Sequence, residues 1–454
     1  MNGTARVIVV GAGVAGLSAA FRLQQQGFEV TVLEADDRVG GKTMASRRDG
    51  YILNRGATVL GASYDAVKAL ARDVGVEDDI VRVPSRVGIV RDGRTYWLRG
   101  GGFGALVDFI RTPLLSWKSK LVLTRAAFDA LRARRKAGFG DPSLRAELDV
   151  ESVSDYSDRR LNSEVRDIIL DPVMGGLLIV DGLAASVADL FFLASNVLGG
   201  GVLGYRGGID FLARAVARRL DVRISATVTQ VTTDADGARV TWTENGEARE
   251  EQVSGVVLSV PAPLVPRLYP QLDSGLRELL DSIPQGNIVS LRFALDTRPD
   301  VDALLTLVPK SELGGLALVM FEHNLSSDVA PAGRGLIGVL LYHEWCTPRL
   351  ELSDDELADA TLCDLEHLVP GVTGQVEFTE VTRWTPGATR SEPGMHRRIA
   401  ELDRAAAADQ RVQLAGDYFN APTVNGSVVS GERAAQRLAG WLSHESAVPR
   451  AERA

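Results

Sequence analysis

One stretch near the start of the chain, RVIVVGAGVAGLSAAFRLQQQGFEVTVLEADDRVGGK, limits the possible folds more than any other. Its β-branched run at 6–10 predicts a buried parallel strand. Residues 17–26 predict a helix that ends at Gly27, and residues 28–33 predict a second strand. A strand, a glycine-rich turn, a helix and a second strand in this order predict a Rossmann-type α/β unit.

The glycine-rich turn, GAGVAG, predicts a dinucleotide site. Gly11 would form the tight turn, Gly13 would let a pyrophosphate approach the backbone, and Gly16 would let the helix pack closely on the strand. The helix N-terminus would offer N–H groups and the positive end of its dipole to the phosphates. Glu34 ends the second strand, where it can accept hydrogen bonds from ribose hydroxyls and disfavours a 2′-phosphate. The alternative is a strand–helix turn that contains glycines by chance. Such a turn is not expected to have a strand before it and a helix, a second strand and an acid after it.

Two further glycine segments follow the second strand. The segment RVGGK brings Gly40, Gly41 and the cation Lys42 towards the same dinucleotide. The segment GYILNRGATVLG puts Gly56 and Ala57 in a position to pass under a flat ring. These additions distinguish an FAD site from an NAD site.

A second motif stands near the other end of the chain, at 411–442. The segment RVQLAGDYFNAPTVNGSVVSGERAAQRLAGWL predicts a strand, then Gly416 and Asp417, a loop, and a helix through 427–442. The alternative is an ordinary C-terminal Rossmann strand and helix. The order of motifs at both ends of the chain disfavours that alternative.

Together these segments resemble the flavin-containing amine oxidase superfamily, which includes monoamine oxidases, protoporphyrinogen oxidases and phytoene-type desaturases. The resemblance extends over nearly the full length and is most specific at the two ends. It implies noncovalent FAD and an α/β fold, in which a discontinuous Rossmann-type FAD-binding domain joins an α+β substrate-binding domain. The implied domains are 1–75, 205–285 and 385–454 for FAD, and 76–204 and 286–384 for the substrate.

The resemblance also assigns cofactor contacts to residues of this chain. It puts Lys42 at the phosphates, where the family usually has Arg, so the charge is kept and the bidentate fork is lost. It puts the backbone of Val228 at adenine, Asp417 at the phosphate–ribitol region and the backbone near Val424 at the flavin pyrimidine. The implied cofactor-binding residues are Gly11, Gly13, Ala15, Gly16, Glu34, Ala35, Gly40, Gly41, Lys42, Gly56, Ala57, Thr58, Val228, Trp384, Gly416, Asp417 and Val424.

Three positions bear on the type of reaction. Amine oxidases carry a lysine that bonds a water at flavin N5, and the matching position here is Ser290. They also flank the substrate amine with two aromatic rings, and the matching positions here are Gly387 and Thr423. Covalent members attach the flavin through a cysteine near Pro386, where this chain has none. The resemblance therefore favours members that desaturate C–C bonds.

Two more side chains are pocket candidates. Arg292 shares a strand face with Ser290 and could clamp a substrate carboxylate, although a solvent-facing or ion-paired arginine is favoured. Trp384 could pack beside the isoalloxazine or belong to the core. No histidine or carboxylate can be assigned as the catalytic base.

The resemblance implies an FAD-dependent oxidase or desaturase. It would remove a hydride and a proton from a C–C bond of a small or cyclic substrate, such as a cyclic ketone, a cyclic acid or a porphyrinogen-like compound. Because no second GxGxxG follows a strand, we expect electrons to pass to O2, with H2O2 formed, rather than to arrive from bound NAD(P)H. An amine oxidase with an atypical aromatic cage is the runner-up, and a catalytically inert flavin-binding partner protein is the third alternative.

The composition limits the remaining partners. The net charge of −9 argues against nucleic acid and against an anionic membrane surface. Two cysteines and five histidines without metal-ligand spacing predict no disulfide framework and no metal site, and fit the cytoplasm. Neither a signal peptide nor a membrane-spanning segment is expected. The Arg/Lys face of a predicted helix at 118–138 could bind a membrane or a partner, but a solvated face is favoured.

Overall fold

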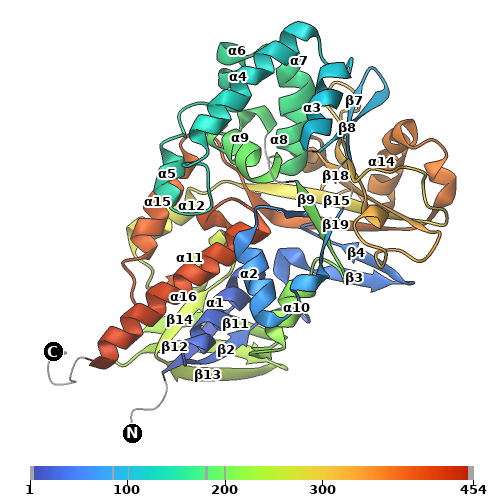
Figure 1. Ribbon diagram of the computed structural model, residues 1–454. Helices are drawn as coiled ribbons and strands as arrows, with labels where there is room; N and C mark the ends of the chain where they lie inside the picture. The colour runs from blue at the N-terminus through green and yellow to red at the C-terminus, as the bar shows by residue number, and fades with distance from the viewer. Residues whose placement is uncertain (1–4, 84–85, 101, 179–181, 199–200, 448–454) are drawn as a thin grey trace.

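A five-stranded parallel sheet and a seven-stranded, largely antiparallel sheet organise the chain (Figure 1). The computed structural model describes residues 5–83, 86–100, 102–178, 182–198 and 201–447. The two sheets confirm the predicted α/β fold with a Rossmann-type unit and a second part of mixed helices and strands.

The five-stranded sheet is built as the N-terminal motif predicts. Its order is β10–β2–β1–β14–β20, and every neighbouring pair is parallel. Its strands are β1 (Arg6–Val10), β2 (Glu29–Leu33), β10 (Asp221–Arg223), β14 (Gly255–Leu258) and β20 (Val412–Leu414). Along β1, Val7 and Val9 enter one apolar core, whereas Ile8 and Val10 enter another. Both faces of the sheet are therefore covered, as a parallel sheet requires.

Helices cover one face of this sheet. They are α1 (Val14–Gln25), α2 (Asp65–Val74), α10 (Phe211–Ala217) and α16 (Val424–Ala447). The helices α1 and α16 approach closely, since a Cβ added at Gly431 would lie 2.0 Å from the carbonyl oxygen of Ala15. α16 begins at Val424 rather than at the predicted 427, because Thr423 caps it by accepting a hydrogen bond from the Gly426 N–H at 3.1 Å.

A small antiparallel sheet and short helices cover the other face. The strands are β11 (Ala226–Thr233), β12 (Ala238–Glu244) and β13 (Glu247–Val253), and the helices are α11 (Val265–Leu268), α12 (Ser274–Asp281) and α15 (Met395–Ala406). β11 and β12 pair antiparallel as a hairpin.

The seven-stranded sheet has the order β19–β15–β18–β17–β16–β7–β8. Its strands are β7 (Arg86–Arg91), β8 (Arg94–Arg99), β15 (Gln285–Leu295), β16 (Leu305–Leu307), β17 (Leu316–Phe321), β18 (Gly335–Leu341) and β19 (Val376–Thr389). It thus joins residues 86–99 to residues 285–389 in one sheet. The residue bounds expected for the FAD-binding and substrate-binding domains stay a prediction.

Helices lie on both sides of this sheet. One side carries α13 (His343–Cys346) and α14 (Asp354–Leu368). The other carries α3 (Gly102–Arg111), α4 (Trp117–Ala133), α6 (Val153–Arg160), α7 (Ser163–Val165), α8 (Asp171–Leu177) and α9 (Val187–Leu193), with α5 (Pro142–Ala146) beside α15. Along β15, Leu291 and Phe293 enter the core under α13 and α14. Because side chains alternate along a strand, Ser290 and Arg292 face the opposite side.

Short strands connect the two main sheets. The hairpin β3 (Ala45–Arg48) and β4 (Tyr51–Asn54) follows the second glycine segment, and β5 (Leu60–Gly61), β6 (Ile80–Arg82) and β9 (Val202–Tyr205) form a small sheet. The segment between β4 and β5 contacts the seven-stranded sheet, since the Arg55 carbonyl accepts a hydrogen bond from the Trp384 Nε1 at 3.0 Å.

Candidate functional site

The candidate site begins at the carboxyl edge of the five-stranded sheet. All its strands are parallel, so their carboxyl ends meet at one edge, where open α/β sheets bind ligands. The glycine turn follows β1, Glu34 follows β2, and Gly416 and Asp417 follow β20. The tertiary structure thus brings the N-terminal and C-terminal motifs to the same edge.

The three glycines of the turn play different roles. A Cβ added at Gly11 would lie 2.5 Å from the Ser259 carbonyl oxygen, and one added at Gly16 would lie 2.0 Å from the Gly11 carbonyl oxygen. Gly11 also has a φ of +100°, which favours glycine. A Cβ added at Gly13 would meet no atom within 4 Å. The first and third glycines are required by the fold, whereas Gly13 leaves open space at the helix N-terminus, where the motif predicts the pyrophosphate.

The second glycine segment lies directly on the first. The Gly40 N–H donates to the Ala12 carbonyl at 2.9 Å, and a Cβ added at Gly41 would lie 3.3 Å from the Gly13 Cα. The Gly40 φ of +117° and the Gly41 φ of +53° both favour glycine. RVGGK and GAGVAG therefore form one continuous backbone surface.

Glu34 is held against this surface. Its Oε2 accepts a hydrogen bond from the Ala12 N–H at 2.6 Å, and its Oε1 accepts one from the Asp36 N–H at 2.9 Å. Burial raises the pKa of the Glu34 carboxyl, and the backbone donors oppose that rise. A carboxylate keeps further lone pairs after these bonds, so Glu34 can fix the glycine turn and still accept from ribose hydroxyls.

A cavity of about 130 Å³ lies between the nucleotide unit and the seven-stranded sheet. Of the predicted cofactor residues, its lining contains Lys42, Gly56, Ala57, Trp384, Asp417 and Val424. Of the predicted reaction-defining positions, it contains Ser290, Gly387 and Thr423 together with Trp384. Residues that are far apart in the sequence thus share one site.

An ion pair joins the two ends of the chain at this cavity. The Lys42 Nζ lies 2.8 Å from the Asp417 Oδ2, with both side chains partly exposed. The N-terminus of α16 faces the same cavity through Thr423, Val424 and Ser427. A cation and a helix N-terminus together favour a ligand that carries negative charge.

If Lys42 contacts a phosphate of FAD as the resemblance implies, replacing it by Gln is expected to raise the dissociation constant of FAD about tenfold, because a charge-assisted contact of roughly 1.5 kcal/mol would be lost. Asp417 would also lose its ion-pair partner. Titrating apoprotein with FAD by flavin fluorescence measures the change. Lys42→Arg keeps the charge and should bind normally. If Lys42→Gln binds FAD with the same dissociation constant as the parent protein, Lys42 makes no phosphate contact.

The backbone carbonyl of Arg55 holds two side chains that line the cavity. It accepts hydrogen bonds from the Trp384 Nε1 at 3.0 Å and from the Ser290 Oγ at 3.4 Å. The next residue, Gly56, must be glycine here, since an added Cβ would lie 2.1 Å from the Lys42 carbonyl oxygen. Arg55 was not among the predicted site residues, although it stands inside the segment GYILNRGATVLG.

Arg292 lies outside the residues that line this cavity. Its Nε lies 2.9 Å from the Glu322 Oε1, and its Nη2 donates to the Thr58 Oγ1 at 3.0 Å. The two charged side chains are only 3% and 0% exposed. Complete burial raises the pKa of the Glu322 carboxyl, and Arg292 opposes that rise. This geometry favours the ion-paired alternative over a substrate clamp.

The other predicted cofactor residues are not among those that line the cavity. Val228 is buried in β11, whose first residue, Ala226, donates its N–H to the Glu34 carbonyl at 2.8 Å. Thr58 is held by Arg292 and, through its carbonyl, by the Tyr205 hydroxyl at 2.6 Å. Ala15 is buried in the first turn of α1, and Ala35 is exposed directly after Glu34.

Apolar residues that sequence reasoning missed form much of the cavity wall. They are Leu177, Leu178, Ile288, Leu340, Ala388 and Pro422. Each has the pattern of an ordinary core residue, so nothing in the sequence distinguishes it from the core.

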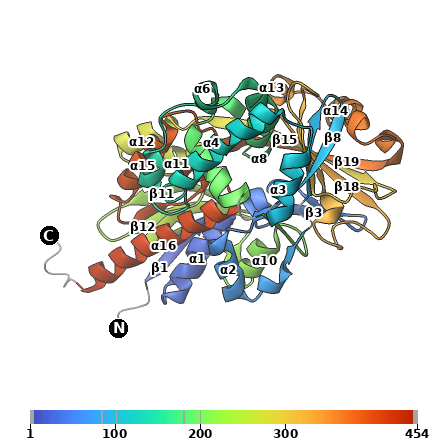
Figure 2. The ribbon, with the colours of Figure 1, turned by 45° about the horizontal axis from the view of Figure 1, so that its top comes forward.

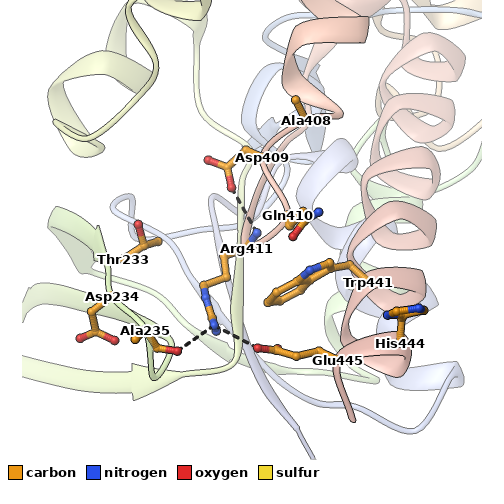
Figure 3. A pocket seen from close by; sticks show the side chains of 10 residues that line it. All are labelled: Thr233, Asp234, Ala235, Ala408, Asp409, Gln410, Arg411, Trp441, His444 and Glu445. Carbon is orange, nitrogen blue, oxygen red and sulfur yellow. Dashed lines mark hydrogen bonds and ion pairs between the residues drawn. The ribbon is translucent and has the colours of Figure 1, made fainter. Parts of the chain in front are cut away.

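A larger and more open hollow, of about 730 Å³, lies at the opposite edge of the five-stranded sheet (Figure 3). Arg411, which directly precedes β20, crosses it. Its Nη2 donates to the Ala235 carbonyl and to the Glu445 Oε1, each at 3.1 Å, and its guanidinium lies over the Trp441 ring. Ligands of open α/β sheets bind at the carboxyl edge, so this hollow is not the dinucleotide site.

The described residues hold no group of three or more His, Cys, Asp or Glu side chains that could bind a metal ion. They also contain no helix with the length and apolar character needed to cross a bilayer.

Comparison with known proteins agrees with this geometry. The sequence profile of the family described as flavin containing amine oxidoreductase matches residues 14–439. Protoporphyrinogen oxidase 2 of Arabidopsis thaliana is 23% identical, over 96% of this chain and 94% of that protein. Coproporphyrinogen III oxidase of Bacillus subtilis is 22% identical, over 95% of this chain and 97% of that protein. The solved structure of cyclohexylamine oxidase from Brevibacterium oxydans is similar with a TM-score of 0.76 at 18% identity, covering 97% of this chain and 100% of that one; it indicates a shared fold.

Proposed function

This chain belongs to the flavin containing amine oxidoreductase family and uses FAD as its cofactor, and from this premise we propose that it oxidises C–C bonds of a cyclic, porphyrinogen-like substrate. Bound FAD supplies the hydride acceptor for such chemistry. The substrate loses a hydride from one atom and a proton from its neighbour, and O2 is the proposed final acceptor, with H2O2 as product. Two relatives that match nearly the full chain are named as porphyrinogen oxidases, which supports this substrate class.

The observation that carries the proposal is the make-up of the cavity. Ser290, Gly387 and Thr423 line it together, and none of them is the lysine or the aromatic residue that the resemblance associates with amine oxidation. A Cβ added at Gly387 would lie 2.6 Å from the Ile288 side chain and 2.9 Å from the Gly286 carbonyl oxygen. An aromatic side chain at 387 therefore does not fit without a shift of β15.

The rest of the lining is largely apolar. Leu177 and Leu178 of the helical part contribute to it, and so do Leu340, which pairs with Ser290, and Ile288, which lies against Gly387. Such a wall suits a broad hydrocarbon surface better than a charged amine, because burying an unpaired charge is costly.

The proton step limits the substrate further. Among the described lining residues Asp417 is the one carboxylate, and its partner is Lys42. The described lining offers no imidazole and no other carboxylate as a base. The substrate therefore needs a C–H bond that is acidified by its own neighbouring groups, so that water can accept the proton. Porphyrinogens and cyclic ketones meet this requirement better than simple alkanes.

The first test is anaerobic bleaching of the flavin absorbance at about 450 nm in the purified yellow protein. One panel holds porphyrinogens, cyclic ketones and cyclohexane-type acids, and the other holds primary and secondary amines. Fast bleaching by the first panel alone, with H2O2 formed on admission of air, is expected. Fast bleaching by amines would assign the chain to amine oxidation with an atypical cage. A flavin that no compound bleaches would favour the inert flavin-binding protein.

The variant Ser290→Lys separates the two enzyme alternatives within one protein. It restores the lysine at the matching position without adding a cage. If the proposed function is correct, amine turnover by Ser290→Lys stays negligible, and its turnover of the porphyrinogen-like substrate falls. A marked rise in amine turnover, in a protein that already prefers amines, would contradict the proposal.

A further inference from the structure

Arg145, in the short helix α5, is a buried cation that forms no ion pair. It is 3% exposed, and in the described part of the chain no carboxylate lies within ion-pair distance of its guanidinium. Burial lowers the pKa of Arg145 to about 10, so the side chain stays charged at neutral pH. Asp189 opposes that fall without an ion pair to Arg145, and is itself paired with the His396 Nε2 at 3.1 Å. Because a buried charge without a counter-charge is costly, the contacts of Arg145 must offset a considerable loss.

Arg145 donates to two oxygen atoms, and one of them belongs to the C-terminal motif. Its Nη2 donates to the Asn420 Oδ1 at 2.8 Å and to the Gly138 carbonyl at 2.6 Å. Its guanidinium lies 4.6 Å from the centre of the Phe192 ring of α9, a cation–π contact that holds it in this place. Hydrogen bonds from a charged donor are roughly twice as strong as neutral ones. Arg145 therefore fixes Asn420 more firmly than a neutral side chain could.

Asn420 is itself buried and uses both ends of its amide. Its Oδ1 accepts a second hydrogen bond from the Ala421 N–H at 2.8 Å, and its Nδ2 donates to the Phe139 carbonyl at 2.7 Å. The Phe139 ring meets Tyr64 and Phe192 edge to face, with ring centres 5.6 and 5.0 Å apart. The segment that contains Phe139 and α5 is thus packed in place and holds Asn420 at both the oxygen and the nitrogen.

Asn420 lies in the cofactor loop, residues 417–423, which leads into α16. Asp417, Pro422 and Thr423 of this loop line the candidate site, and Val424 directly after it does so too. Figure 2 shows α16 running from the C-terminal edge of the molecule towards its middle, which brings the loop to the inner end of the helix. Asn420 is not among the lining residues, so its link to Arg145 can act on the site through the backbone of the loop.

We infer that Arg145 is a positioning residue for FAD, which acts through Asn420 on the cofactor loop. The resemblance puts Asp417 at the phosphate–ribitol region and Val424 at the flavin pyrimidine, so a displaced loop would loosen the flavin half of the cofactor. The loop has little regular structure of its own, and a charge-assisted bond from a packed segment fixes its place. The inference depends on the cofactor alone and is independent of the proposed substrate.

Release of FAD from the holoenzyme, followed by the fluorescence of the freed flavin, tests this inference. Arg145→Met keeps most of the side-chain volume but removes the donor, and it should release FAD about tenfold faster than the parent protein. Asn420→Ala should do the same. The double variant Arg145→Met/Asn420→Ala should release FAD no faster than Asn420→Ala, because both changes remove one contact. Arg145→Lys keeps the charge and a donor, so it should restore most of the retention.

Arg277→Met is the matched control. Arg277 of α12 also donates to backbone carbonyls, those of Pro266 and Pro270 at 3.4 and 3.3 Å, and its variant should release FAD as the parent does. Arg145→Met and Asn420→Ala should alter the visible circular dichroism of the bound flavin in the same way, with an unchanged far-ultraviolet spectrum. Release at the parent's rate from either single variant, or multiplied effects in the double variant, would overturn the inference. If Arg145→Met does not fold, Asn420→Ala and Arg145→Lys decide by the same criteria.

Discussion

Gly13→Val is expected to give a folded protein that has lost its FAD. Gly13 has a φ of −67° and a ψ of 167°, which valine adopts without strain, and its added Cβ meets no protein atom within 4 Å. The isopropyl group would instead occupy the space that the motif reserves for the pyrophosphate. Overpacking of this kind costs roughly 3 kcal/mol, so the dissociation constant of FAD should rise at least about a hundredfold. Purification should give colourless protein with an unchanged circular dichroism spectrum.

Two other glycines provide the controls for this experiment. Gly440, at an exposed position of α16, also has no atom within 4 Å of an added Cβ, so Gly440→Val should stay fully yellow. Gly16→Val should damage the fold itself, because its Cβ would lie 2.0 Å from the Gly11 carbonyl oxygen. A fully loaded, yellow Gly13→Val protein would refute the assignment of the pyrophosphate to this turn.

Arg292→Met is expected to lower the free energy of unfolding by about 3–5 kcal/mol, because it leaves the buried carboxylate of Glu322 without its counter-charge. The hydrogen bond to Thr58 is lost as well. Urea denaturation of the FAD-loaded protein should show a clearly lower midpoint. Burial raises the pKa of the folded-state carboxyl, so protonation relieves part of the cost. The deficit should therefore be smaller in mildly acidic buffer and grow as the pH rises through the folded-state pKa of Glu322.

The double variant Arg292→Met/Glu322→Gln should recover most of this loss, since the uncompensated charge is removed and the amide can still bond to Asn54. Arg239→Met is the matched control. Arg239 also pairs with a glutamate, Glu250, but both side chains are about half exposed, so its loss should cost less than about 1 kcal/mol. Equal effects of Arg292→Met and Arg239→Met would mean that the buried pair contributes nothing special to stability.

The nucleotide unit could be predicted from the amino-acid sequence alone. The order of strand, glycines, helix and acid in residues 6–34 depends on local backbone requirements, and these are readable without tertiary contacts. Gly11 and Gly16 illustrate the point, because Gly11 has a φ of +100° and a Cβ added at Gly16 would lie 2.0 Å from the Gly11 carbonyl oxygen. The C-terminal motif around Asp417 was readable for the same reason. Its helix was predicted too short because the cap by Thr423 is a detail of side-chain geometry.

The surroundings of the cofactor site could not be predicted, because they depend on contacts between distant segments. Leu177, Ile288 and Leu340 have the same apolar character as the core, and folding alone brings them to one cavity from three separate elements. Arg292 shares a strand face with Ser290, yet Glu322, thirty residues away in the sequence, turns it into a buried ion pair. The helix α4 was likewise ambiguous, because a helical period identifies an apolar face without saying whether that face is covered, and the structure leaves Trp117, Leu121 and Phe128 exposed. Local backbone chemistry is encoded in short motifs, whereas burial is a property of the whole fold.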